Sequence, residues 1–143
     1  MIKLEELKKP IIKEIECFES EFEKTFKAES ELLNKVNQYI LQKRGKGIRP
    51  ILTLLAAKAF GEINETTLKS AVGLEMLHTA SLIHDDVVDE TNERRGQKSV
   101  NAIWNNKISI LVGDYLLSQS ISKITETQNI DRCHNCSSWF RMG

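Results

Sequence analysis

Apolar residues recur every three or four positions along almost the whole chain, the spacing that places them on one face of an α-helix. Runs of alternating polar and apolar residues, typical of strands, are nearly absent. The pattern predicts helices over residues 4–26, 30–42, 51–60, 66–89, 100–104 and 108–124, joined by short loops. We therefore expect an all-α protein built as a helical bundle.

Three of these predicted helices carry information about the core. The first has an apolar stripe opposite its lysines and glutamates, made of Leu7, Ile11, Ile15, Phe18, Phe22 and Phe26. Pro10 lies near its start, where a helix tolerates proline, and Cys17 is expected in the core. The helices over residues 51–60 and 66–89 are apolar nearly all round, so both are expected in the interior of the bundle.

A basic turn, Gly45-Lys46-Gly47-Ile48-Arg49-Pro50, separates the second and third predicted helices. Its two glycines allow unusual backbone angles, and its proline suits the first turn of the next helix. Lys46 and Arg49 are either solvated loop charges or part of an anion site. The pair Arg94 and Arg95, in another loop, favours the anion site.

Three carboxylates, Asp85, Asp86 and Asp89, lie at the end of the longest apolar helix. On a helix, Asp85 and Asp89 share one face and Asp86 is about 100° round the axis. Like charges at this spacing repel one another unless a cation lies between them. Mg²⁺ fits such a cluster, whereas a calcium loop needs a glycine that is absent here. The alternative is a solvated acidic helix end.

The composition narrows the class of protein. The chain of 143 residues, 41% hydrophobic and 28% charged, suits one globular domain. Its 20 basic and 20 acidic residues balance, so no overall field recruits nucleic acid. It has no apolar run of about 18 residues, no signal-peptide core at its start, and only three cysteines. We expect a cytoplasmic protein without a nucleic-acid partner or transmembrane segment.

Five segments together resemble the polyprenyl synthetase family of trans-isoprenyl diphosphate synthases, in its medium- or long-chain type such as octaprenyl diphosphate synthase. They are the basic turn of residues 45–50, Glu75-Met76-Leu77-His78, Asp85-Asp86-Val87-Val88-Asp89, Arg94-Arg95-Gly96 and Gly113-Asp114. They follow the family's order and spacing over about residues 43–120. The resemblance implies a helical bundle of the isoprenoid synthase type that joins isopentenyl diphosphate to an allylic diphosphate with Mg²⁺.

The same resemblance implies roles for the charged residues. Three aspartates match the family's first aspartate-rich motif, which holds Mg²⁺ against the leaving diphosphate: Asp85, Asp86 and Asp89. Arg94 matches the contact to the allylic diphosphate. Four residues match the cluster that holds isopentenyl diphosphate: Lys46, Arg49, His78 and Arg95. For His78 the alternative is a histidine satisfied within the core.

Two small residues, Ala80 and Ser81, precede Asp85 by five and four positions. In the family, bulky aromatic residues near these positions stop elongation early. The resemblance therefore implies a medium or long product for this chain. Asp114 marks the last of the five motifs, and we assign it no contact.

The resemblance covers about the amino-terminal half of a family member, and the second aspartate-rich motif has no counterpart in the chain. We expect residues 1–130 to be the amino-terminal part of a polyprenyl synthetase domain. Residues 131–143 lack a helical stripe and are expected to be an atypical tail, frame-shifted or disordered. Cys133 and Cys136 in this tail have no second pair of ligands nearby to complete a zinc site.

These expectations combine into one function and two alternatives. The chain is expected to be a Mg²⁺-dependent prenyltransferase, weak or inactive in this shortened form, that forms a homodimer or associates with a full-length synthase. One alternative is a non-catalytic helical partner of a full-length synthase, because a shortened bundle leaves apolar faces open. The other is a module that binds diphosphate without turnover.

Overall fold

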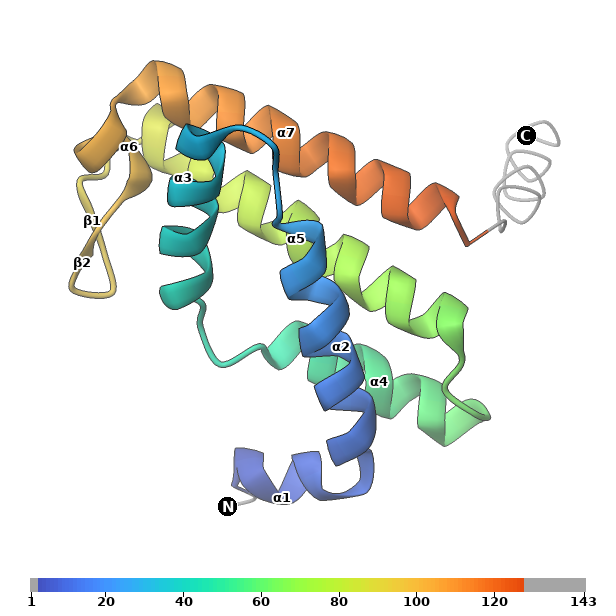
Figure 1. Ribbon diagram of the computed structural model, residues 1–143. Coiled ribbons are helices and arrows are strands. Elements are labelled where there is room, and N and C mark those ends of the chain that lie inside the picture. Colours follow the sequence, from blue (N-terminus) through green and yellow to red (C-terminus); the bar gives the residue numbers. More distant parts are fainter. Residues whose placement is uncertain (1–2, 128–143) are drawn as a thin grey trace, which may run out of the picture.

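The computed structural model describes residues 3–127, and the chain folds there almost entirely as helices (Figure 1). In chain order the elements are α1 (Leu4–Lys8), the 3₁₀-helix η1 (Lys9–Ile11), α2 (Ile12–Thr25), α3 (Glu31–Gln42), α4 (Ile48–Phe60), α5 (Glu65–Val88), β1 (Glu93–Arg94), β2 (Gln97–Lys98), α6 (Val100–Trp104) and α7 (Asn106–Thr125). The prediction of an all-α bundle is confirmed. Within these residues, no helix combines the length and the apolar character needed to cross a membrane.

The two longest helices, α5 and α7, run antiparallel and side by side (Figure 1). Near the start of α5, Gly73 lets the helices approach closely, because a Cβ there would lie 2.6 Å from Cγ1 of Ile124. The Ser120 hydroxyl donates a 2.7 Å hydrogen bond to the Gly73 carbonyl. Near the end of α5, Gly113 of α7 leaves room for the ring of His84. The charged motifs are positioned relative to these two helices.

Three of the helices begin at side chains that accept hydrogen bonds from otherwise unpaired backbone amides. Ser30 accepts from the Leu33 amide at the start of α3. Asn64 accepts from the Thr67 amide at 2.9 Å at the start of α5. Asn105 does the same at the start of α7. These polar residues explain why the helices begin where they do.

An aromatic stack from α2 fills the space beside α5. Phe18, Phe22 and Phe26 are almost fully buried, with neighbouring ring centroids 5.5 Å and 4.8 Å apart. Ile11 is buried on the same side, as the apolar stripe predicted, whereas Leu7 is more than a third exposed. From Ile11 onward, the apolar stripe therefore correctly predicted which face of this segment is buried.

The prediction of one continuous helix over residues 4–26 is wrong. Helix α1 ends at Lys8, and a 3₁₀ turn precedes the start of α2. Pro10 has no amide hydrogen to donate, and its ring crowds the carbonyl four residues earlier, so an α-helix cannot pass through it without a break. The backbone of Ile11, at φ −131° and ψ 23°, marks the point where the direction changes.

Two predictions about burial are also corrected. Cys17 is exposed, because it lies about 100° round the helix from the buried Phe18. Helices α4 and α5 are not enclosed on all sides: Leu52 is 56% exposed, Leu74 is 45% exposed and Phe60 is almost fully exposed. No element within residues 3–127 covers that side of the two helices. Their apolar side chains there are therefore exposed in this part of the chain.

A two-stranded antiparallel hairpin follows α5, which the helical pattern did not predict. Glu93 pairs with Lys98, and Arg94 pairs with Gln97. The two residues between the strands, Arg95 and Gly96, both have positive φ angles, 55° and 74°. A two-residue turn with both φ angles positive matches the twist of the strands it joins. The hairpin therefore presents Arg95 at its tip.

Candidate functional site

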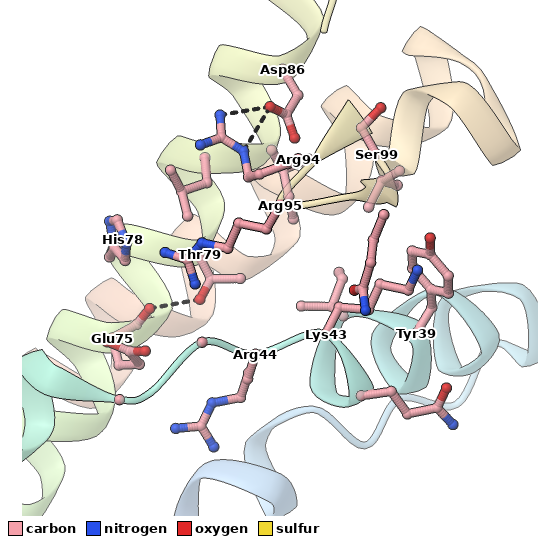
Figure 2. A pocket seen from close by; sticks show the side chains of 18 of the residues that line it. Tyr39, Lys43, Arg44, Glu75, His78, Thr79, Asp86, Arg94, Arg95 and Ser99 are labelled. Carbon is pink, nitrogen blue, oxygen red and sulfur yellow. Dashed lines mark hydrogen bonds and ion pairs between the residues drawn. The ribbon is translucent and has the colours of Figure 1, made fainter. Parts of the chain in front are cut away.

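A pocket of about 520 Å³ lies between the end of α3, the basic turn, the middle of α5 and the hairpin (Figure 2). Two carboxylates line it, those of Glu75 and Asp86. Its seven cationic side chains are Lys43, Arg44, Lys46, Arg49, Arg94, Arg95 and Lys98. His78 lines it as well. Such an excess of positive charge, supplied by separate segments of the chain, suits a multiply charged anion.

The basic turn is held against the tip of the hairpin. Gly47 has a φ of 61°, a left-handed conformation that favours glycine, and it immediately precedes α4. A Cβ at Gly45 would overlap the guanidinium group of Arg95. The absence of a side chain at Gly45 therefore lets Arg95 reach into the pocket beside Lys46 and Arg49.

We expect Gly45→Ala to weaken binding of inorganic pyrophosphate by about tenfold, because the new methyl group displaces the Arg95 guanidinium and one charge-assisted contact is lost. Stability should change little, since Gly45 has no positive φ and the displaced group is the end of a flexible side chain. Isothermal titration calorimetry and thermal unfolding measure the two effects. Gly61→Ala is the matched control, as no atom lies within 4 Å of its Cβ position. Equal affinities for the two variants would contradict this role.

The other side of the hairpin is anchored to α3. The Tyr39 hydroxyl donates a 2.7 Å hydrogen bond to the carbonyl of Lys98. The Lys43 Nζ lies 4.2 Å from the centroid of the Tyr39 ring, and the ring packs edge-on against Trp104 at 5.2 Å. These contacts fix the hairpin, and with it Arg94 and Arg95, relative to the helices.

Arg44 lines the pocket but is engaged elsewhere. Figure 2 shows its side chain turned away from the other cations, toward α2. There it forms an ion pair with Glu19, and its guanidinium carbon lies 4.1 Å from the centroid of the Phe22 ring. Arg44 thus ties the start of the basic turn to the aromatic stack.

Arg94 and Asp86 form an ion pair at one side of the pocket (Figure 2). Nε and Nη2 of Arg94 donate to the same carboxylate oxygen, at 2.9 Å and 2.7 Å. This hydrogen bonding raises the pKa of Arg94 further above its ordinary value, so the guanidinium stays charged. Asp86 is buried, and its ion pair with Arg94 offsets the free-energy cost of burying a charged carboxylate.

Asp85 and Asp89 lie on a different face of the same helix end and are exposed. Because Asp86 turns toward Arg94, the three carboxylates are not gathered into one cluster. Among residues 3–127, no three His, Cys, Asp or Glu side chains lie close enough together to hold a metal ion. The set of three metal ligands taken from the sequence remains a prediction.

His78 is partly buried in the pocket, and the Arg95 side chain extends toward it (Figure 2). Burial lowers the pKa of His78 below its ordinary value. The nearby Arg49, Arg95 and Arg94 lower it further, and Glu75 acts in the opposite direction. The imidazole is therefore largely uncharged at neutral pH and can donate one hydrogen bond to an anion.

Asp114, to which the sequence assigned no contact, lies against His84. Its carboxylate oxygen is 3.2 Å from His84 Nε2, and the same nitrogen is 3.4 Å from the carbonyl of Ile110. Gly113 leaves the space in which the ring lies. The last of the five motifs thus packs against the residue immediately before Asp85.

Ala80 and Ser81 lie in different environments. Ala80 is buried, whereas Ser81 lines an apolar groove of about 480 Å³ between α4 and α5, together with Leu52, Thr53, Leu74 and Leu77. This groove shares Arg49 and His78 with the cationic pocket. A charged group in the pocket and an apolar chain in the groove could therefore belong to one ligand. The roles of Ala80 and Ser81 in product length remain predictions.

The structure brings all four residues expected to hold isopentenyl diphosphate into the lining of the pocket, together with Arg94 and Asp86. Sequence reasoning missed Glu75, Lys43 and Lys98 as lining residues. Of these, Glu75 had a visible signal, since it is the one charged residue among the buried positions of α5 between residues 71 and 80. The expectations for residues 131–143, including Cys133 and Cys136, lie outside the described residues.

Comparison with known proteins accounts for this arrangement of motifs. The family model described as polyprenyl synthetase matches residues 30–140, which is more than half of the chain. The chain belongs to the polyprenyl synthetase family. The resemblance inferred from the five motifs is therefore confirmed.

Relatives in this family are similar to the chain over most of its length. An all-trans-nonaprenyl-diphosphate synthase (geranyl-diphosphate specific) from Rhodobacter capsulatus is 45% identical over 100 residues, covering 69% of this chain and 31% of the relative. Component 2 of the heptaprenyl diphosphate synthase of Bacillus subtilis is 41% identical over 113 residues, covering 78% and 32%. The chain thus spans about a third of the length of the curated relatives it matches.

Solved structures of the family agree with the fold. A decaprenyl diphosphate synthase from Rhodobacter capsulatus matches with a TM-score of 0.83 and 34% identity, covering 89% of this chain and 39% of that one. A polyprenyl synthase from Caulobacter crescentus, complexed with calcium and isoprenyl diphosphate, matches with a TM-score of 0.85 and 26% identity, covering 95% and 42%. The isoprenoid synthase type of bundle is therefore confirmed for this part of the family fold.

Proposed function

We propose that the chain is the diphosphate-binding part of a polyprenyl diphosphate synthase, which condenses isopentenyl diphosphate with an allylic diphosphate. The observation that carries the proposal is the convergence of Lys46 and Arg49, His78, and Arg95 on one pocket from three separate segments. Guanidinium groups fork onto phosphate oxygens, and an ammonium group adds a point charge. A pocket lined this way is suited to the diphosphate of isopentenyl diphosphate.

The carboxylates beside this pocket fit a magnesium requirement in part. Asp85 and Asp89 are exposed on one helix face, and Mg²⁺ commonly uses one or two carboxylates together with water and phosphate oxygens. These two residues would hold the ion, and Asp86, the third predicted ligand, is paired with Arg94 in this structure. Bound there, Mg²⁺ would supply charge neutralisation for a departing diphosphate. The calcium named with the Caulobacter crescentus structure supports a divalent ion as a cofactor.

Two observations support a medium or long product as part of the proposal. The relatives described above are named for heptaprenyl, nonaprenyl and decaprenyl products. Ser81 is small and lies in an apolar groove that meets the cationic pocket at Arg49 and His78. A growing hydrocarbon chain would pass this side chain without obstruction.

We propose that the chain acts as a homodimer or together with another synthase chain. The Bacillus subtilis relative is itself named as component 2 of a synthase. The division of the chain at about residue 130 stays a prediction, since residues 128–143 are not described.

A second candidate function is a non-catalytic partner of a full-length synthase. Exposed apolar side chains on α4, α5 and α7, such as Leu52, Leu74 and Leu111, favour it. Adding the purified chain to a full-length synthase distinguishes this role. Altered product lengths that persist after loss of the cationic residues Arg49 and Arg95 would support it, and unchanged products would exclude it.

The primary proposal is tested by binding of pyrophosphate with and without Mg²⁺. We expect Mg²⁺ to tighten binding by at least about tenfold, and EDTA to remove this gain but not the binding itself. Asp85→Asn and Asp89→Asn should each abolish most of the gain and leave the metal-free affinity unchanged. Glu62→Gln, the same charge change at an exposed position outside the pocket, is the control.

Two results would contradict the proposal. If the wild-type chain failed to bind pyrophosphate under either condition, the cationic pocket would have no such function. If the aspartate variants kept the full Mg²⁺ effect, the ion would be held elsewhere.

A further inference from the structure

One carboxylate oxygen in the cationic pocket is buried without a hydrogen-bond partner among residues 3–127. Glu75 is 8% exposed, lines the pocket, and its Oε2 accepts no hydrogen bond within residues 3–127. Leaving a charged oxygen buried and unpaired costs free energy, so such groups are rarely retained without a partner in some state of the protein. None of the expected roles in the pocket accounts for it.

Unpaired cations lie in the same pocket. Arg49 and Arg95 form no ion pair with any carboxylate among residues 3–127, in contrast to Arg44 and Arg94. Glu75 lies one turn of α5 before His78, and Arg49 and Glu75 are both close enough to change the pKa of that histidine in opposite directions. Glu75 and Arg49 line the same pocket and form no ion pair with each other within residues 3–127.

A bound diphosphate would make the unpaired carboxylate more costly. Two anions in one partly buried pocket repel each other unless a cation lies between them. A guanidinium group can do this, because its five donors allow one edge to bind a carboxylate while the other binds phosphate oxygens. Arg49, in the first turn of α4, lines this pocket with Glu75 and pairs with no other carboxylate within residues 3–127, so its guanidinium group is available to bridge Glu75 and the ligand.

We propose that Glu75 is a positioning residue that holds Arg49 against the diphosphate when the anion binds. The carboxylate accepts hydrogen bonds from one edge of the guanidinium group, and the other edge faces the phosphate oxygens. Glu75 thus tightens binding of an anion even though it carries a negative charge itself. This inference rests on the proposed function of the pocket.

The direction in which one substitution changes pyrophosphate affinity tests this proposal. Pyrophosphate affinity of the full chain, measured by calorimetry in EDTA, should fall about tenfold in Glu75→Gln, because the guanidinium group loses its charged acceptor. A carboxylate that only repelled the ligand would give the opposite result, tighter binding on substitution. Glu62→Gln changes the net charge equally at an exposed position outside the pocket, and its affinity should equal that of the wild type.

A second variant changes Arg49, the exposed member of the pair. Arg49→Lys keeps the charge but removes the fork, so it should also weaken binding about tenfold. Adding Glu75→Gln to Arg49→Lys should weaken binding no further, because the two side chains act as one unit. Arg49→Lys alone leaves the buried position unchanged, so its effect on affinity does not depend on how Glu75→Gln folds.

Each remaining outcome has a definite meaning. Unchanged or tighter binding in Glu75→Gln, or wild-type affinity in Arg49→Lys, would overturn the positioning role and leave the cationic pocket intact. Independent, additive losses in the double variant would also overturn it. If the wild-type chain bound no pyrophosphate, the proposed function would fail and this inference with it.

Discussion

Replacing Arg95 with alanine is expected to weaken binding of pyrophosphate by about 30- to 100-fold, which corresponds to about 2–3 kcal/mol for a charge-assisted contact. Arg95 lies at the tip of the hairpin, packs over Gly45, and extends toward His78 in the pocket (Figure 2). It forms no ion pair within residues 3–127, so its charge is available to a ligand. Isothermal titration calorimetry in EDTA measures the loss.

The backbone at Arg95 makes this a clean experiment. Its φ of 55° strains alanine about as much as arginine, so folding should be little affected. Arg95→Lys should give an intermediate affinity, because it keeps the charge without the fork. Lys35→Ala removes an exposed cation paired with Glu31 outside this pocket and outside the other grooves, and it serves as the charge control. Equal losses in Arg95→Ala and Lys35→Ala would show that only net charge matters.

Removing the central ring of the aromatic stack should have the largest effect on stability. We expect Phe22→Ala to lower the free energy of unfolding by about 3–5 kcal/mol, the usual cost of a large cavity in a core. Phe22 is fully buried between Phe18 and Phe26, and Arg44 rests on its ring. Its loss removes apolar contacts with both neighbours and the support of the arginine that precedes the basic turn.

Chemical denaturation followed by circular dichroism measures this change. Ile12→Ala is the matched control, because Ile12 is in the same helix but is about half exposed. It should change stability by no more than about 0.5 kcal/mol. A loss below about 1 kcal/mol in Phe22→Ala would contradict the view that the stack holds α2 to the rest of the bundle.

The existence of the helices could be predicted because it depends on local spacing of apolar residues, which the sequence displays directly. Their breaks and burial could not. Pro10 was read as tolerable near a helix start, but it lies far enough inside residues 4–26 to force a 3₁₀ turn. The apolar surroundings of Leu52 and Leu74 indicated burial, yet no element within residues 3–127 covers them. The periodicity of apolar residues predicts which face of a helix is apolar, but it does not predict which element packs against that face.

The candidate site was partly predictable for a similar reason. The motifs supplied Lys46, Arg49, His78 and Arg95, and the structure places all four in one pocket. How they are held depends on contacts between distant segments, such as Tyr39 with Lys98, which no local pattern displays.

The aspartate-rich segment shows the same limit. Helical spacing correctly placed Asp85 and Asp89 on one face. It did not indicate that Asp86 would be buried against Arg94, because that choice depends on the hairpin folding back onto α5. Glu75 could have been singled out, since a charged residue between Val72, Met76 and Ala80 interrupts a buried face.

The central claim is that the cationic pocket binds a diphosphate, and it is tested most directly by mapping pyrophosphate onto the isotopically labelled chain by nuclear magnetic resonance in EDTA. The account predicts the largest shifts at Lys46, Arg49, His78 and Arg95. A second groove, of about 650 Å³ beside α2, is lined by four lysines and three glutamates and is the competing site. Shifts confined to that groove, or no saturable shifts, would contradict the account.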